Sequence, residues 1–285
     1  MKKYLGSFGK AVCYYLLFLG MQFIMVGCLA VSYMAFLLTT GESVDAATEA
    51  LLEAIAVFGA PVTLLSNLLS VAVVFILFYF QNRVFRNEVG IRPVSRKLKI
   101  QCAFFAYGLC MVVLMVLSLL PESLMADYSD ASEILTEASG FSPINFLATV
   151  IVAPICEEIF FRGLIYSRLR RAMSFVPSFI ITGILFGLAH GNLVWGCYAF
   201  ALSTFMCIIL ERHHSLTLTI TMHITFNLVG GYMGRLPLPD AVLSLLVLLG
   251  FVIFAVMGYQ LIIKTPLPEP LPADAKFDPD NSDES

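Results

Sequence analysis

The amino-acid sequence predicts an all-α, polytopic membrane protein, and three observations support this fold class. Of the 285 residues, 59% are hydrophobic and 13% are charged, whereas soluble domains are about half apolar and a quarter charged. The apolar residues gather in eight runs, each near the roughly 20 residues that a helix needs to cross a bilayer. The charged residues lie mainly between the runs and are divided unevenly by sign. We therefore expect a lipid bilayer as the surroundings and no nucleic-acid partner.

The eight runs predict about eight transmembrane helices. They cover approximately residues 11 to 38, 56 to 80, 100 to 120, 143 to 166, 175 to 192, 194 to 210, 215 to 234 and 241 to 263. The fourth, fifth and seventh contain polar side chains that a simple anchor would avoid. The first run faintly resembles a lipoprotein signal peptide around Cys28, but it continues ten residues further, which is too long for a signal. We expect an uncleaved first helix.

The basic residues predict the orientation. If the N-terminus is cytoplasmic, 16 of the 17 Lys and Arg residues fall on the cytoplasmic side, and Arg235 falls on the other. The outer loops 39 to 50 and 121 to 142 carry acidic residues instead. Because cytoplasmic loops are rich in Lys and Arg, we expect a multi-pass protein of the cell membrane with both termini in the cytoplasm.

One folded domain is expected. Residues 1–264 would form the membrane domain, and the Pro-rich, acidic stretch 265–285 has too little apolar surface to fold, so it should be a disordered cytoplasmic tail. We recognise no Gly-rich phosphate loop, internal repeat or soluble second domain. The seven cysteines lie within apolar runs and form no C-x-x-C pair, which favours small core side chains over disulfides or a metal cluster.

Ionisable side chains inside the apolar runs are the candidate functional residues, because each is costly to bury unless it is paired or faces water. On the fourth run, Glu158 and Arg162 are four residues apart, so they share a helical face and can form an ion pair. Glu157 lies about 100° round the helix and stays free. Alternatively, this segment is only the ordinary end of a helix, with Arg162 starting a positive loop. That interpretation leaves the two adjacent carboxylates unexplained.

Two of the four histidines also lie inside apolar runs. His190 follows Phe186 by four residues on the fifth run, and His223 precedes Asn227 by four on the seventh, so each pair shares a face. A single buried histidine is more often structural than catalytic. At a rise of about 1.5 Å per residue, however, Glu157, His190 and His223 lie roughly 12 to 20 Å inside the membrane. These three side chains could therefore meet in one cavity.

This set of side chains is equipped to hydrolyse a peptide bond. A carboxylate in a cavity of low dielectric can take a proton from water, and an imidazole with a carboxamide can donate hydrogen bonds to the oxyanion. Other intramembrane protease chemistries fit worse, because H-E-x-x-H and G-x-S-x-G are absent and no Asp lies within the eight runs. Two imidazoles and a carboxylate could also bind zinc, and the spacing leaves the presence of a metal open.

The three segments resemble the motifs E-E-x-x-x-R, F-x-x-x-H and H-x-x-x-N/D of the CAAX-prenyl-protease and bacteriocin-processing family, also called CPBP or Abi. Here they read Glu157-Glu158 to Arg162, Phe186 to His190 and His223 to Asn227, in the family order, within residues 143–235. Eukaryotic members remove the last three residues of prenylated proteins, and bacterial members are associated with bacteriocin self-immunity, peptide maturation or membrane-protein processing.

The resemblance implies a fold of eight helices with a conical cavity open to the cytoplasm. It implies that Glu157 activates water with His190, that His223 and Asn227 stabilise the oxyanion, and that Glu158, Arg162 and Phe186 support the site. A zinc ion, if present, would be held by Glu157, His190 and His223.

The expected function is that of an intramembrane endopeptidase acting on a membrane-associated protein or peptide. One alternative is a non-catalytic bacteriocin-immunity or scaffold protein that keeps the fold and binds a partner peptide. Another is a transporter, because intramembrane charges also mark ion pathways, although we find no repeated halves or paired broken helices. The substrate, the cleaved bond and the oligomeric state are not encoded in any pattern that we recognise.

Overall fold

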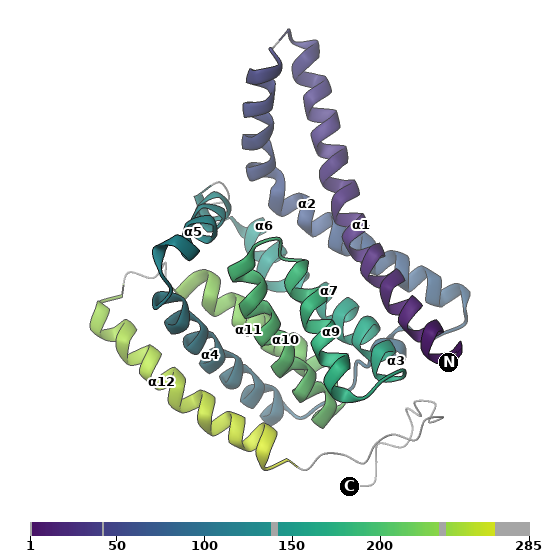
Figure 1. Ribbon diagram of the computed structural model, residues 1–285, viewed down its shortest axis with the longest axis vertical. Helices are drawn as coiled ribbons and strands as arrows, with labels where there is room; N and C mark the ends of the chain where they lie inside the picture. The colour runs from purple at the N-terminus through teal and green to yellow at the C-terminus, as the bar shows by residue number, and fades with distance from the viewer. Residues whose placement is uncertain (1, 42, 138–141, 234–237, 266–285) are drawn as a thin grey trace.

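The computed structural model describes residues 2–41, 43–137, 142–233 and 238–265, and throughout these ranges the regular structure is helical (Figure 1). This confirms the all-α fold class. The predicted tail, apart from its first residue, lies outside the described residues, as does Arg235. The elements, with π-helical segments labelled η, are α1 (Lys2–Thr39), α2 (Val44–Phe80), α3 (Phe85–Val89), α4 (Arg96–Ser118), α5 (Glu122–Glu137), α6 (Pro143–Phe146), η1 (Leu147–Val152), α7 (Ala153–Glu158), η2 (Ile159–Tyr166), α8 (Ser167–Arg170), α9 (Phe175–Leu188), α10 (Leu193–His213), α11 (Leu216–Tyr232), α12 (Asp240–Gly258) and η4 (Tyr259–Ile263).

Six helices in the described part of the chain are long and apolar enough to cross a membrane. They are Leu5–Thr39, Val57–Phe80, Arg96–Ser118, Pro143–Arg170, Leu193–His213 and Asp240–Ile263. Each coincides with one of the eight predicted runs. The remaining two runs form α9, with 14 residues, and α11, with 17, which are shorter than a typical span of about 20. The chain is thus a polytopic membrane protein, and the total of eight crossings stays a prediction.

The helices pack around the segment Pro143–Arg170, which runs from α6 to α8 and is called the central span below. It contacts α1 and α2 on one side and α9 and α11 on another, while α4 packs against both α11 and α12. The α1–α2 hairpin is long, and its tip projects beyond the other helices (Figure 1). One apolar cluster forms around Phe160, Phe161 and Phe186, and a second around Phe105 and Met206.

The central span is not a regular α-helix, because π-helical segments lie on both sides of α7. In η1 the backbone N–H of Ala153 donates to the carbonyl of Ala148, five residues back. The next residue, Pro154, has no N–H to donate. Short π-helical segments inside α-helices are frequent at functional sites, and α7 carries both candidate carboxylates.

The expectation that the cysteines are core residues is correct for four of the seven. Cys13, Cys28 and Cys197 are exposed on helix surfaces, and the other four are buried; all seven are free thiols. The expectation was wrong for the three exposed residues because a membrane-spanning helix has an apolar lipid-facing side as well as an apolar core-facing side.

Loops that carry the predicted cytoplasmic charges meet at one end of the helix bundle. Glu88 on α3 accepts a hydrogen bond from Arg168, at the end of the central span, at 3.2 Å. Arg170 forms an ion pair with Glu211, near the end of α10. The segments that follow α2, the central span and α10 therefore lie on the same side of the bundle, as the predicted topology requires.

We expect the α5 side of the protein to face away from the cytoplasm. In a variant without the native cysteines, Asp127→Cys should react with a membrane-impermeant maleimide in intact cells, whereas Arg171→Cys should react only after the membrane is opened. Both positions are exposed, so both should react in lysed cells. Labelling of position 171 but not of position 127 in intact cells would reverse the orientation.

Candidate functional site

Glu158 and Arg162 form a fully buried ion pair on the central span. Arg162 Nη1 donates to Glu158 Oε1 at 2.8 Å, and both side chains are 0% exposed. The same oxygen lies 2.9 Å from His223 Nδ1 on α11, and because a carboxylate only accepts, Nδ1 carries the proton. The spacing in the sequence predicts the ion pair. The hydrogen bond between Glu158 and His223 joins residues that are far apart in the sequence, so helical spacing does not predict it.

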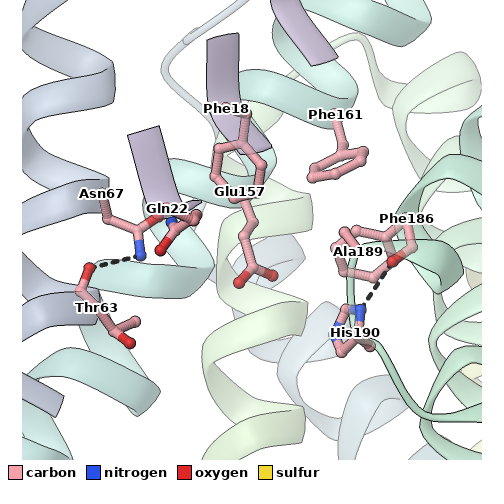
Figure 2. Close-up of a pocket in the computed structure, with 9 residues that line it drawn as sticks. All are labelled: Phe18, Gln22, Thr63, Asn67, Glu157, Phe161, Phe186, Ala189 and His190. Carbon is pink, nitrogen blue, oxygen red and sulfur yellow. Dashed lines mark hydrogen bonds between the residues drawn. The ribbon is translucent and has the colours of Figure 1, made fainter. Parts of the chain in front are cut away.

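Glu157 lines a cavity of about 180 Å³ (Figure 2). Its side chain is 20% exposed, in contrast to that of its neighbour Glu158, as expected for adjacent positions that point about 100° apart on a helix. The carboxylate points into the cavity, with His190 to one side of it and the amide of Asn67 to the other (Figure 2). The cavity is roomy enough to hold water beside the carboxylate.

His223 lies near Glu157 but is not among the residues that line this cavity. Its Nε2 is 3.7 Å from Glu157 Oε2, which is longer than a hydrogen bond. One imidazole ring thus bridges the two adjacent carboxylates, with Nδ1 bonded to Glu158 and Nε2 directed toward Glu157.

His190 lies in the turn after α9. The apolar run predicts that the fifth helix extends to residue 192, but α9 ends at Leu188, so the placement of His190 on the helix was wrong. Gly191 has a φ of +69° and Asn192 caps α10 with its side chain, and these residues turn the chain earlier than apolarity indicates. His190 Nδ1 lies 2.7 Å from the carbonyl oxygen of Phe186. Because a carbonyl only accepts, Nδ1 carries the proton, and Nε2 of the neutral ring keeps its lone pair.

Phe186 lies at the centre of these side chains and is 1% exposed. The guanidinium carbon of Arg162 is 4.4 Å from its ring centroid, which is a favourable cation–π distance. The rings of His190 and His223 make T-shaped contacts with Phe186, with centroid distances of 4.8 Å and 5.7 Å. One aromatic ring therefore fixes three polar groups relative to one another.

Asn227 donates a hydrogen bond from its side-chain nitrogen to the carbonyl oxygen of Thr149 at 3.0 Å. Thr149 lies in η1, and in a π-helix a carbonyl is paired with the N–H five residues later. For Thr149 that residue is Pro154, which has no N–H. Asn227 supplies the donor that the proline lacks and ties α11 to the central span. A carboxamide has two N–H donors, so the second remains for a ligand.

We expect the Asn227 side chain to stabilise the fold through this carbonyl. Asn227→Ala removes this hydrogen bond from the Thr149 oxygen, which should lower the free energy of unfolding by about 0.5 to 1.5 kcal/mol. Pro154→Ala restores an N–H at position 154, so Asn227→Ala should lower the free energy of unfolding by less in that background. Thermal unfolding of the wild type, both single variants and the double variant measures this coupling. An identical loss in both backgrounds would contradict the compensation.

The three residues named for a zinc ion do not form a metal site in this arrangement. Within the described ranges, no group of three His, Cys, Asp or Glu side chains is placed to hold a metal ion. Glu157 and His223 approach each other, but the Nδ1 atom of His223 is engaged by Glu158 and His190 does not join them in a cluster. The chemistry considered below therefore includes no step at a metal.

Side chains from outside the motifs complete the cavity. Phe18 and Gln22 come from α1, and Thr63 and Asn67 come from α2. None of these four was predicted from the sequence, because the candidates there were ionisable residues and the residues four positions from them. Gln22 and Asn67 are amides inside apolar runs, and burying an amide is also costly without a hydrogen bond. An amide side chain inside an apolar run is therefore the sequence signal that could have identified both residues.

The segment that carries the motifs matches a known family. Residues 139–229 match the family model described as type II CAAX prenyl endopeptidase Rce1-like. This range includes all seven candidate residues, spans about a third of the chain and confirms the family resemblance of the motifs. No curated protein and no solved structure matches the chain.

Proposed function

We propose that this chain, with its Rce1-like domain at residues 139–229, is an intramembrane endopeptidase in which Glu157 activates the attacking water. The observation that carries the proposal is the contrast between adjacent carboxylates. Glu158 is sealed in an ion pair, whereas Glu157 faces a cavity that it shares with His190. A structural role explains the first carboxylate, and proton transfer explains why the second is kept accessible.

Glu157 and His190 would orient one water molecule between them. Each offers a hydrogen-bond acceptor, because the lone pair on His190 Nε2 is free once Nδ1 is bonded to Phe186 O. A water molecule that donates one hydrogen bond to Glu157 and one to His190 directs a lone pair of its oxygen toward a substrate carbonyl. Glu157 takes one proton as the oxygen–carbon bond forms, and it returns that proton to the leaving amine as the carbon–nitrogen bond breaks.

His223 and Asn227 would stabilise the negative charge that develops on the carbonyl oxygen from outside the cavity, which neither residue lines. Since Nδ1 of His223 donates to Glu158, a hydrogen bond to the oxyanion requires a proton on Nε2, and so the protonated ring. Asn227 would contribute its second N–H, the first being bonded to Thr149. Preorganised donors of this kind stabilise a transition state strongly in a site with little water.

The substrate class is a membrane-associated protein or peptide. The family name refers to CAAX prenyl endopeptidases, which suggests a peptide bond near the C-terminus of a lipid-modified chain. A scaffold protein or a transporter would use the same buried ion pair to hold the fold. A scaffold role requires no carboxylate and imidazole acceptor to share one cavity, and a proton pathway would continue through a chain of such groups.

Hydrolysis by the purified protein tests the proposal. The full chain is reconstituted in vesicles and incubated with a farnesylated peptide that ends in a CAAX sequence, and with the same peptide lacking the farnesyl group. We expect the wild type to release the C-terminal tripeptide from at least one of the two, as detected by mass spectrometry. Absence of cleavage of both peptides by folded wild-type protein, or equal cleavage by Glu157→Gln, would overturn the proposal.

A further inference from the structure

The cavity has two walls, which come from different parts of the chain. Glu157, Phe161, Phe186, Ala189 and His190 come from the segment that matches the family. The opposite wall, formed by Phe18, Gln22, Thr63 and Asn67, comes from α1 and α2, outside that segment. In Figure 2 the polar side chains of this second wall lie across the cavity from His190, with the Glu157 carboxylate between them.

The two amides of the second wall retain hydrogen-bonding capacity. Asn67 is 1% exposed and uses its nitrogen to bond the Thr63 carbonyl at 2.9 Å. Its Oδ1 is buried and accepts no hydrogen bond from the described residues. Gln22 is part-buried and held by Ser66, whose hydroxyl donates to Gln22 Oε1 at 2.6 Å, and its nitrogen donates to none of the described residues. A buried polar group without a partner is rare and calls for an explanation.

Packing between α1 and α2 does not explain these groups. The Ser66–Gln22 bond is sufficient to join the two helices, and it requires neither the Gln22 nitrogen nor Asn67. In place of Asn67, an apolar side chain of the same shape would avoid the cost of an unpaired acceptor in an apolar setting. The amides lie instead beside the carboxylate that acts on the substrate in the function proposed above.

We propose that Gln22 and Asn67 bind the peptide backbone of the substrate and position it across the cavity from Glu157. This inference rests on the proposed function. An extended peptide presents C=O and N–H groups in alternation, which match a carboxamide nitrogen as donor and a carboxamide oxygen as acceptor. Both amides are uncharged, so the wall recognises the backbone of a chain and not a charged end. They are positioning residues, and the bond-breaking chemistry stays with Glu157.

Two variants that remove the amides without changing side-chain size test the inference. Gln22→Met and Asn67→Leu should each raise KM for the farnesylated CAAX peptide about tenfold, the size expected for one lost hydrogen bond, with kcat within about threefold of the wild type. Ser70→Ala is the matched control. Ser70 is buried on the same helix, but its hydroxyl bonds to the Ser66 carbonyl and it does not line the cavity, so its KM should not change.

Replacement of single peptide N–H groups by ester oxygen shows whether the contact is direct. An ester at the position that pairs with Asn67 should raise KM of the wild type about tenfold and leave KM of Asn67→Leu unchanged. A merely structural role of Asn67 would give the same ester effect in both proteins. Binding of the fluorescently labelled peptides to Glu157→Gln, with and without Asn67→Leu, repeats the comparison without turnover.

The outcomes separate this inference from the proposed function. Cleavage by the wild type with unchanged KM in both amide variants overturns the inference and leaves the function standing. Binding that depends on Asn67 and on one peptide N–H, without any cleavage, supports the inference and overturns the function. A folded protein that neither binds nor cleaves the peptides overturns both.

Discussion

Glu157→Gln should slow hydrolysis by at least about 10² to 10⁴-fold, the contribution that general-base catalysis typically makes. The amide keeps the size and shape of the carboxylate but cannot take a proton from water. Glu157 forms no close ion pair with Arg162 and is partly exposed in the cavity, so the fold should not depend on its charge. Turnover of the farnesylated CAAX peptide and thermal unfolding are to be measured on the same preparation.

The matched control for Glu157→Gln is the same change at the neighbouring carboxylate, Glu158→Gln. Stability within about 0.5 kcal/mol of the wild type, the usual range for sites without special contacts, together with lost turnover, is the expected pattern for Glu157→Gln. A variant that loses stability in parallel with activity would show that Glu157 supports the fold, and the assignment of the base would then be wrong.

Glu158→Gln should lower the free energy of unfolding by about 3 to 5 kcal/mol, because removal of one partner leaves the other charge buried and unpaired. Arg162 is 0% exposed and its Nη1 atom forms an ion pair with Glu158. His223 shares the same acceptor oxygen, so the change should also disturb the ring that faces Glu157. Unfolding by heat in detergent, compared with Glu157→Gln, measures the difference between the two positions.

Neutralising both members of the ion pair provides a second test of the same interaction. Replacement of a whole buried pair by apolar groups is often neutral or even stabilising. Glu158→Gln/Arg162→Met should therefore regain part of the stability that Glu158→Gln loses. A double variant that is less stable than the sum of its two single changes would show that Arg162 stabilises the fold mainly through other contacts, such as the one with Phe186.

Apolar patterning was sufficient to predict the helices of membrane-spanning length, because a membrane requires every spanning segment to be apolar over a defined length. It was wrong for the outer loop 121 to 142, where Glu122–Glu137 forms α5, and for the loop 39 to 50, where α2 already begins at Val44, because polar helices carry no such apolar signal. It overestimated the fifth helix, since the run was extended to residue 192, past the turn that Gly191 and Asn192 form. It also gave no sign of the π-helical segments. Those depend on the local effect of Pro154 and on a donor, Asn227, that reaches the helix from a distant part of the chain.

Within the candidate site, the sequence predicted what depends on helical periodicity. The ion pair of Glu158 and Arg162 and the separation of Glu157 from it both follow from positions on one helix. Contacts between helices did not follow, such as the bond from His223 to Glu158. The contribution of α1 and α2 to the cavity was missed for the same reason, because packing between helices decides which side chains meet.

The division of the cavity between α1–α2 and the later helices has a consequence for how the protein is made. A nascent chain is synthesised from its N-terminus, so Gln22 and Asn67 enter the membrane well before residues 157 to 190 exist. Ser66, which belongs to the same hairpin as Gln22, already gives that amide a partner at this stage. Asn67 likewise has its bond to Thr63 within α2, so each amide keeps one hydrogen bond while the hairpin waits in the bilayer. The cavity closes only when α7 and α9 arrive beside it, and the proposed water-activating site is therefore completed late in synthesis.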